Sequence, residues 1–136
     1  LAPRVAVQEY GRSNHELLDA LRVRGAEVTS VRIYQWDLPE DTQPLREAAR
    51  RIAAGEADVL LLTTAVQLPH LFRMAPEADL LTALRRMVIA SIGPTTTEAL
   101  EDYGLVPDIT PTHPKMGFLV KETAEQAPAL FARKRA

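Results

Sequence analysis

The sequence predicts a single α/β domain of the doubly wound, flavodoxin-like kind, in which a parallel sheet of about five strands carries helices on both faces. Strand-like and helix-like segments alternate along the whole chain, which is typical of a parallel sheet covered by helices. The chain has 136 residues, 46% of them hydrophobic and 25% charged. That length suits one hydrophobic core rather than two.

Each expected element follows from a local pattern. Ser13 and Glu16 form a capping box at the start of the first helix, and Gly25 occupies the position after its end. The apolar residues of the second helix recur at helical spacing as far as Gly55. The predicted strands are residues 4–8, 28–34, 58–62, 87–92 and 107–110. The predicted helices lie within residues 13–25, 45–55, 66–84, 94–103 and 115–131, and the third region divides in two near Pro76.

Residues 35–41 break the periodicity and are the best linker candidate. We therefore divide the chain into a first βαβ unit (1–34), a linker (35–41) and the remaining βα units (42–136). Five βα units favour closure of the chain into one five-stranded sheet, and we expect closure if the chain is an isolated fragment. Pro39 stiffens the linker and favours the alternative, exchange of the first unit with another copy.

Composition excludes several classes of function. The net charge of −2 and pI near 5.9 give no electrostatic signal for nucleic acid or an anionic membrane. With no cysteine, the chain has no disulfide and no thiolate nucleophile, which fits a cytoplasmic protein. The longest strongly apolar stretch, Val59–Leu62, is too short to span a bilayer, and no leader is visible. We expect a soluble, cytoplasmic protein with no nucleic-acid or membrane partner.

Ligands of such sheets bind at the carboxyl ends of the strands, and here those ends carry mainly hydroxyl and amide side chains. No glycine-rich nucleotide motif, Walker lysine or nucleophile elbow is present. His15, His70 and His113 are isolated in sequence, so we expect no metal site. Many neutral donors and few fixed charges suit a large, flexible, carboxylate-rich ligand.

The most informative strand end is the run from Gly93 to Thr97. Glycine allows a sharp turn, and the free N–H groups and hydroxyls that follow can bind an anion. The alternative is that Thr95 only caps the next helix. Thr64 has the same two interpretations, as anion ligand or turn residue. Lys115 can add positive charge at the rim.

The tyrosines at strand ends also have two interpretations. Tyr10 and Tyr34 are packing aromatics by default, although Tyr34 stands directly before the linker.

Five stretches, taken together, resemble the C-terminal half of uroporphyrinogen-III synthases in order and separation. They are residues 5–11, which end in Tyr10-Gly11, and residues 24–28, 33–36, 55–58 and 90–96. Residues 113–120 are similar to the last loop and helix of that family.

The resemblance implies a lyase of tetrapyrrole (haem) biosynthesis that needs no cofactor. It would cyclise the linear hydroxymethylbilane to uroporphyrinogen III, with loss of water and inversion of the last pyrrole ring, mainly by orienting the substrate. The alternative is a tetrapyrrole-binding sensory module without catalytic activity. A third possibility is an interaction domain without a small ligand.

The resemblance also implies roles for individual residues. Tyr34 matches the tyrosine proposed to assist departure of the hydroxyl, and Thr95 and Thr96 match threonines that follow Gly93-Pro94. Thr64 stands where the family has serine. Leu62 and Ala65-Val66 depart from the family's residues at that strand end. Tyr10, Gly11, Gly93 and Lys115 complete the candidate substrate contacts.

The family is two-lobed and about twice this length, and its chain crosses between the lobes just after the position of Tyr34. Residues 1–34 would then belong to one lobe and the later residues to the other. The resemblance then implies that the partner completing each lobe would be the missing N-terminal half of the enzyme or a second copy of this chain.

Overall fold

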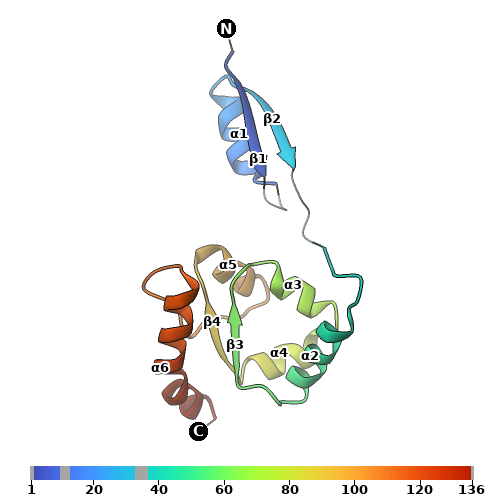
Figure 1. Ribbon diagram of the computed structural model, residues 1–136, viewed down its shortest axis with the longest axis vertical. Coiled ribbons are helices and arrows are strands. Elements are labelled where there is room, and N and C mark those ends of the chain that lie inside the picture. Colours follow the sequence, from blue (N-terminus) through green and yellow to red (C-terminus); the bar gives the residue numbers. More distant parts are fainter. Residues whose placement is uncertain (1, 10–12, 33–36, 136) are drawn as a thin grey trace. The chain divides into compact units, whose positions relative to one another are not determined.

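The computed structural model describes residues 2–9, 13–32 and 37–135. The chain separates into two compact units, an N-terminal unit (Leu1–Pro39) and a C-terminal unit (Glu40–Ala136). Figure 1 shows the helices and strands of each unit. Both have α/β architecture.

The N-terminal unit is one βαβ motif. Its strands β1 (Arg4–Glu9) and β2 (Glu27–Arg32) are parallel, with Val5 opposite Val28, and helix α1 (His15–Val23) connects them. Leu18 of α1 is buried at 4% exposure. The cap of α1 differs from the sequence prediction: Asn14, not Ser13, accepts the N–H of Leu17. The Ser13 hydroxyl instead donates to the carboxylate of Glu9.

The C-terminal unit is built around a second parallel pair, β3 (Val59–Leu62) and β4 (Val88–Ser91). Its helices are α2 (Gln43–Ala53), α3 (Gln67–Phe72), α4 (Glu77–Leu84), α5 (Pro94–Asp102) and α6 (Met116–Lys134). The predicted division of the third helical region is confirmed, because Pro76 is the N-cap of α4. Gly55 follows α2 with φ +78°, as its predicted position after the helix requires.

All four residues of β4 are buried, and its side chains alternate between two cores. Met87 and Ile89 belong to a cluster with Leu68, Leu80 and Leu100, on the side of α2, α3 and α4. Val88 and Ala90 pack with residues of α6, including Leu119. Figure 1 shows α6 on one side of the two strands and α2 and α4 on the other. The C-terminal unit is therefore a sheet covered on both faces.

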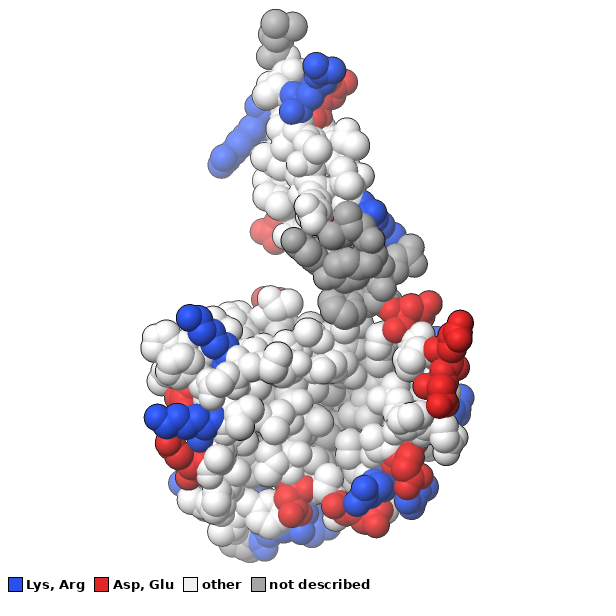
Figure 2. Space-filling view, in the orientation of Figure 1, with Lys and Arg blue, Asp and Glu red and all other residues white. Residues whose placement is uncertain are grey.

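The charged side chains of the C-terminal unit lie mainly around the rim of the face that Figure 2 shows, and both signs are interspersed there. The middle of this face is uncharged (Figure 2). Among the described residues on this face, neither sign of charge gathers into one large patch.

The single sheet of about five strands is not formed among the described residues, where the strands make two separate two-stranded sheets. The expectation that an isolated chain closes through the linker is wrong for this structure. Strand β1 pairs with β2 along its whole length, and the outer edge of each strand pairs with no further strand among the described residues.

The fifth predicted strand is reduced to one parallel bridge between Ala90 and Ile109. Pro107 lies beside it and has no N–H to donate to a ladder. The bridge is nonetheless well bonded, because the peptide N–H groups of Asp108 and Ile109 both donate to the Ile89 carbonyl, at 2.8 and 3.2 Å.

Candidate functional site

A cleft of about 340 Å³ lies where β3 and β4 end, within the C-terminal unit. We call it the strand-end cleft. Its walls come from the turn after β3, the start of α5 and the loop before α6. The residues that line it are Thr63, Thr64, Ala65, Ile92, Gly93, Pro94, Thr95, Thr96 and Pro114.

The side chain of Gln67, the first residue of α3, fixes the turn after β3. Its Oε1 accepts the peptide N–H of Thr63 at 2.9 Å and that of Thr64 at 3.2 Å. Thr64 therefore lies in a turn whose shape is set locally, as its turn interpretation expected, and it also lines the cleft. The sequence analysis missed Gln67. An amide side chain at a helix start, three residues after Thr64, is the signal that would have revealed it.

The second wall begins at Gly93, the N-cap of α5, whose backbone is extended at φ −177°. The buried Ser91 hydroxyl donates to the Gly93 carbonyl at 3.0 Å and lies 2.9 Å from Oγ1 of Thr97. The N–H of Thr97 also donates to the Gly93 carbonyl, at 3.0 Å. These bonds fix the turn between β4 and α5 from beneath, and Ser91 was another residue that the sequence analysis missed.

No side chain caps α5, and Thr95 is its second residue rather than its N-cap. The capping interpretation of Thr95 is therefore wrong. The first N–H groups of a helix have no partner within the helix, so those of Thr95 and Thr96 are available to a ligand at the cleft. Thr95 is exposed and Thr96 is only 3% exposed, so the two threonines offer different groups to that ligand.

The loop before α6 forms the third wall through Pro114, and α6 itself holds this loop. The Glu122 carboxylate accepts the N–H of Thr112 at 3.2 and 3.1 Å. The rings of His113 and Phe118 lie 4.5 Å apart between centroids. Lys115 is the exposed N-cap of α6 and directly follows Pro114. It stands next to the lining in sequence but does not line the cleft itself.

Four of the predicted site residues thus line one cleft: Thr64, Gly93, Thr95 and Thr96. Three others, Tyr10, Gly11 and Tyr34, lie outside the described residues. The described lining carries no ionisable side chain. Hydroxyl and N–H donors at a helix start can bind a carboxylate, but a proton donor has to come from elsewhere.

At the end of β1, in the N-terminal unit, Glu9 is a buried carboxylate at 4% exposure. It accepts hydrogen bonds from the Ser30 hydroxyl, from Ser13, and from the N–H of Asn14 at 2.8 Å. The hydrogen bond from Ser30 does most to lower the pKa of Glu9 below its usual 4.5, while burial opposes it. Glu9 therefore stays ionised and ties the start of α1 to both strands.

Two negative findings concern the described part of the chain. No group of three or more His, Asp or Glu side chains there is arranged to bind a metal ion. No helix there combines the length and apolar character that a bilayer span requires.

Comparison with known proteins relates the sequence and the α/β fold of this chain to one family. The sequence model of the family described as uroporphyrinogen-III synthase HemD matches residues 3–121. The "Putative uroporphyrinogen-III synthase" of Methanothermobacter thermautotrophicus is 34% identical over 87 residues, which are 62% of this chain and 34% of that protein. The "Uncharacterized protein YjjA" of Bacillus subtilis is 28% identical over 126 residues, which are 89% of this chain and 46% of that protein.

Solved structures of uroporphyrinogen III synthase are also similar to this chain. Uroporphyrinogen III synthase from the extremely thermophilic bacterium Thermus thermophilus superposes with a TM-score of 0.66 at 27% identity, over 95% of this chain and 51% of the solved chain. A selenomethionine derivative of a mutant of that enzyme gives a TM-score of 0.69 at 25% identity, over 94% and 52%.

These matches define an α/β protein of the tetrapyrrole-synthase class. The chain belongs to the uroporphyrinogen-III synthase family. It spans about half the length of the relatives and solved structures that it matches, or less.

Proposed function

We propose that the protein carrying this chain is a uroporphyrinogen-III synthase, a cytoplasmic lyase of tetrapyrrole (haem) biosynthesis. It converts hydroxymethylbilane to uroporphyrinogen III and water, with the last pyrrole ring inverted. The family match over residues 3–121 carries this proposal. The strand-end cleft supports it, because neutral donors suit a substrate that bears many carboxylates.

In this proposal the cleft holds one or more substrate carboxylates. Gly93, Thr95 and Thr96 present N–H groups and hydroxyls at the start of α5, Thr64 faces them from the other wall, and Lys115 adds positive charge at the rim. Because the turns are fixed by Gln67 and Ser91, the donors need little rearrangement on binding. Such preorganisation favours catalysis by orientation.

Tyr34 is proposed as the hydrogen-bond donor or general acid that helps the hydroxyl leave, and Tyr10 and Gly11 as further substrate contacts. A tyrosine hydroxyl has an ordinary pKa near 10 and is protonated at neutral pH, as a donor has to be. The described lining of the strand-end cleft has no ionisable side chain, which leaves this role open for Tyr34. No cofactor is required by this chemistry.

We further propose that residues 1–34 belong to one lobe, residues 42–136 to the other, and residues 35–41 to the crossing between them. Each lobe would then gain strands from the N-terminal half of the enzyme or from a second copy, and so form the five-stranded, flavodoxin-like sheet. A two-stranded sheet is marginal by itself, and β1 and β2 form such a sheet here. The match to about half of the Thermus structure also supports it.

Product analysis with hydroxymethylbilane tests the function. The full-length protein should give mainly the type III isomer, whereas spontaneous closure gives type I. The isolated chain, assayed beside it, shows whether this half is active alone. If the full-length protein gives only type I at the spontaneous rate but still binds the tetrapyrrole, it is a sensory module instead. If it neither converts nor binds the bilane, the proposal fails.

A further inference from the structure

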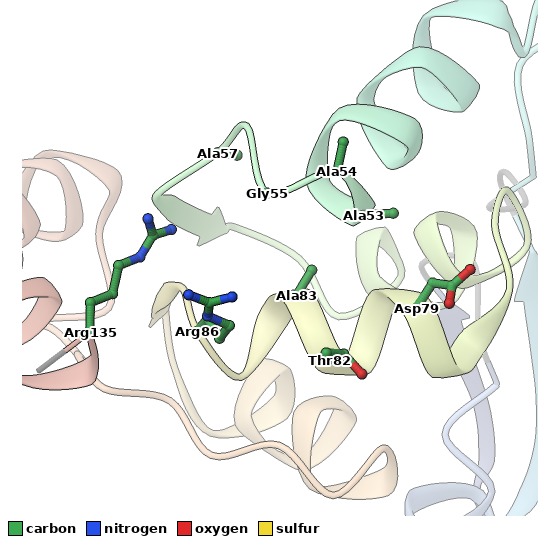
Figure 3. A pocket seen from close by; sticks show the side chains of 9 residues that line it. All are labelled: Ala53, Ala54, Gly55, Ala57, Asp79, Thr82, Ala83, Arg86 and Arg135. Atoms are coloured by element: carbon green, nitrogen blue, oxygen red, sulfur yellow. The ribbon is translucent and has the colours of Figure 1, made fainter.

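A second cavity lies in the C-terminal unit, at the edge of the sheet opposite the strand-end cleft (Figure 3). Its lining includes Ala57 and Arg86, which come just before β3 and β4. It is therefore at the amino ends of the strands, and we call it the amino-edge cavity. The residues that line it are Ala53, Ala54, Gly55, Ala57, Asp79, Thr82, Ala83, Arg86 and Arg135.

The floor of this cavity is small and apolar. Four alanines and one glycine are among its lining residues, and Ala53, Ala57 and Ala83 pack against the main hydrophobic core. Small side chains leave an open volume of about 470 Å³, which lies in the range of small-molecule sites. The anchored floor gives an apolar body a fixed surface to lie on.

Two arginines supply the charge. The Arg135 guanidinium lies 4.2 Å from the centre of the Phe131 ring and 3.5 Å from the exposed Asp58 carboxylate, so a bound anion would share this guanidinium with Asp58. Arg86 makes no ion pair or side-chain hydrogen bond within the described residues. Arg85, not Arg86, is the C-cap of α4 and so occupies the position from which a cation favours the helix end. Figure 3 shows both guanidinium groups toward the end of the cavity near the start of β3.

The end of the cavity away from the arginines carries a negative charge instead. Asp79 lies there on α4, and Thr82 lies between Asp79 and Arg86 (Figure 3). The Thr82 hydroxyl already donates to the Ala78 carbonyl at 2.9 Å, which leaves the Asp79 carboxylate as the principal polar group. A ligand with negative charge at both ends would meet this carboxylate and be repelled.

We propose that the amino-edge cavity binds a small organic anion with one charged end. Its carboxylate or phosphate lies between Arg86 and Arg135, as guanidinium groups favour, and its uncharged body lies on the alanine floor. The proposal concerns a site separate from the strand-end cleft. It does not depend on the proposed synthase activity.

Amide NMR titration of the whole chain tests this with three probes that share one ring: benzoate, phenyl phosphate and neutral benzamide. We expect saturable shifts at residues 53–57 and 83–86 with at least one anion, dissociation constants of about 1 mM or below, and no saturable shift with benzamide. Benzoate and phenyl phosphate together distinguish a carboxylate site from a phosphate site. Terephthalate, which carries a second carboxylate at the opposite end of the ring, should bind less tightly than benzoate.

Substitutions of the arginines test which of them bind the anion. Arg86→Gln and Arg135→Gln should each weaken the bound anion by about tenfold or more, as expected for loss of a charged hydrogen bond. Arg85→Gln, at an exposed neighbour that does not line the cavity, should leave it unchanged. The proposal is overturned if neither anion shifts these amides saturably up to about 10 mM, if benzamide binds equally well, or if the Arg86 variant keeps wild-type affinity while its spectrum shows the native fold.

Discussion

Gln67 shows at the residue scale how one side chain can shape a binding site. Its Oε1 accepts two adjacent peptide N–H groups, and these belong to residues that line the strand-end cleft. Without it, both groups lose their acceptor and the turn can take other conformations. The geometry of the wall therefore depends on a residue that does not line the cleft.

We expect Gln67→Leu to lower the free energy of unfolding by about 1 kcal/mol, since the exposed N–H groups can turn to water. Affinity for uroporphyrinogen III should fall as well, because the Thr64 wall is no longer preorganised. Urea unfolding and a binding titration measure the two effects. Gln126→Leu, on the exposed face of α6, is the matched control. Equal affinity in the Gln67 variant and this control would show that the turn needs no support.

Tyr34→Phe should lower turnover of hydroxymethylbilane by about 10²-fold and change KM little, as expected when a general acid is lost. Tyr103→Phe removes the same hydroxyl from a tyrosine whose ring stacks on Phe72 at 4.1 Å, and it should leave turnover unchanged. Steady-state kinetics of the full-length protein provide the comparison. Wild-type turnover in the Tyr34 variant would restrict that tyrosine to packing.

At the element scale, α6 is attached to the sheet by a polar contact as well as by its apolar face. Lys134 Nζ donates to the Asp108 carboxylate at 2.8 Å and to the Met87 carbonyl at 2.6 Å. The same carboxylate accepts the N–H of Ile89 at 2.8 Å. The exposed fractions of the two side chains, 24% and 17%, mean that water screens this pair only in part.

Lys134→Met should therefore destabilise the C-terminal unit by about 1–3 kcal/mol, because the Asp108 carboxylate loses its charged partner. Arg133→Met, an exposed neighbour on the same helix, should cost far less. Combining Lys134→Met with Asp108→Asn should cost less than the sum of the single changes. Urea unfolding midpoints of the four variants measure these losses of stability. Strictly additive losses in the double variant would mean that Lys134 and Asp108 do not interact.

The start of α1 should be sensitive to acid through Glu9. The folded state lowers the pKa of Glu9, first through the hydrogen bond from Ser30. The stabilisation is then fully present above the ordinary value of 4.5 and is lost as pH falls through the lower folded value. Hydrogen exchange of α1 amides from pH 6 down to pH 3, roughly the window in which carboxylates titrate, should show protection that falls with pH. Glu9→Gln should weaken this dependence, and an identical profile in that variant would contradict the role of Glu9.

At the scale of the whole molecule, sequence patterns predicted what depends on neighbouring residues. Alternation, proline positions and glycine caps correctly predicted the order of the helices and the parallel direction of the strands, but they placed the strands in one sheet rather than in two pairs. The sequence pattern also predicted that Thr64, Gly93, Thr95 and Thr96 lie at one edge of the sheet, because the carboxyl ends of parallel strands meet there.

What the sequence did not predict depends on contacts between distant segments or on alternatives close in energy. Strand β1 can pair with β2 alone or join a larger sheet, and both arrangements form similar backbone hydrogen bonds. The local sequence pattern does not distinguish them. Only one bridge forms at Ile109 because Pro107, beside it, has no N–H to donate to a ladder. The strand pattern of residues 107–110 alone did not reveal this. The roles of Gln67, Ser91 and Glu122 are visible only once their bonding partners are placed.

The central claim is that the strand-end cleft binds the carboxylates of a tetrapyrrole. Its most direct test is the affinity of the chain for uroporphyrinogen III, measured for wild type and for the double variant Thr95→Val, Thr96→Val. Valine has nearly the shape of threonine but lacks the hydroxyl, so the fold should persist. We expect affinity to fall about tenfold or more, with Thr29→Val, an exposed residue of β2, unchanged. Undiminished affinity in the folded double variant would contradict the claim.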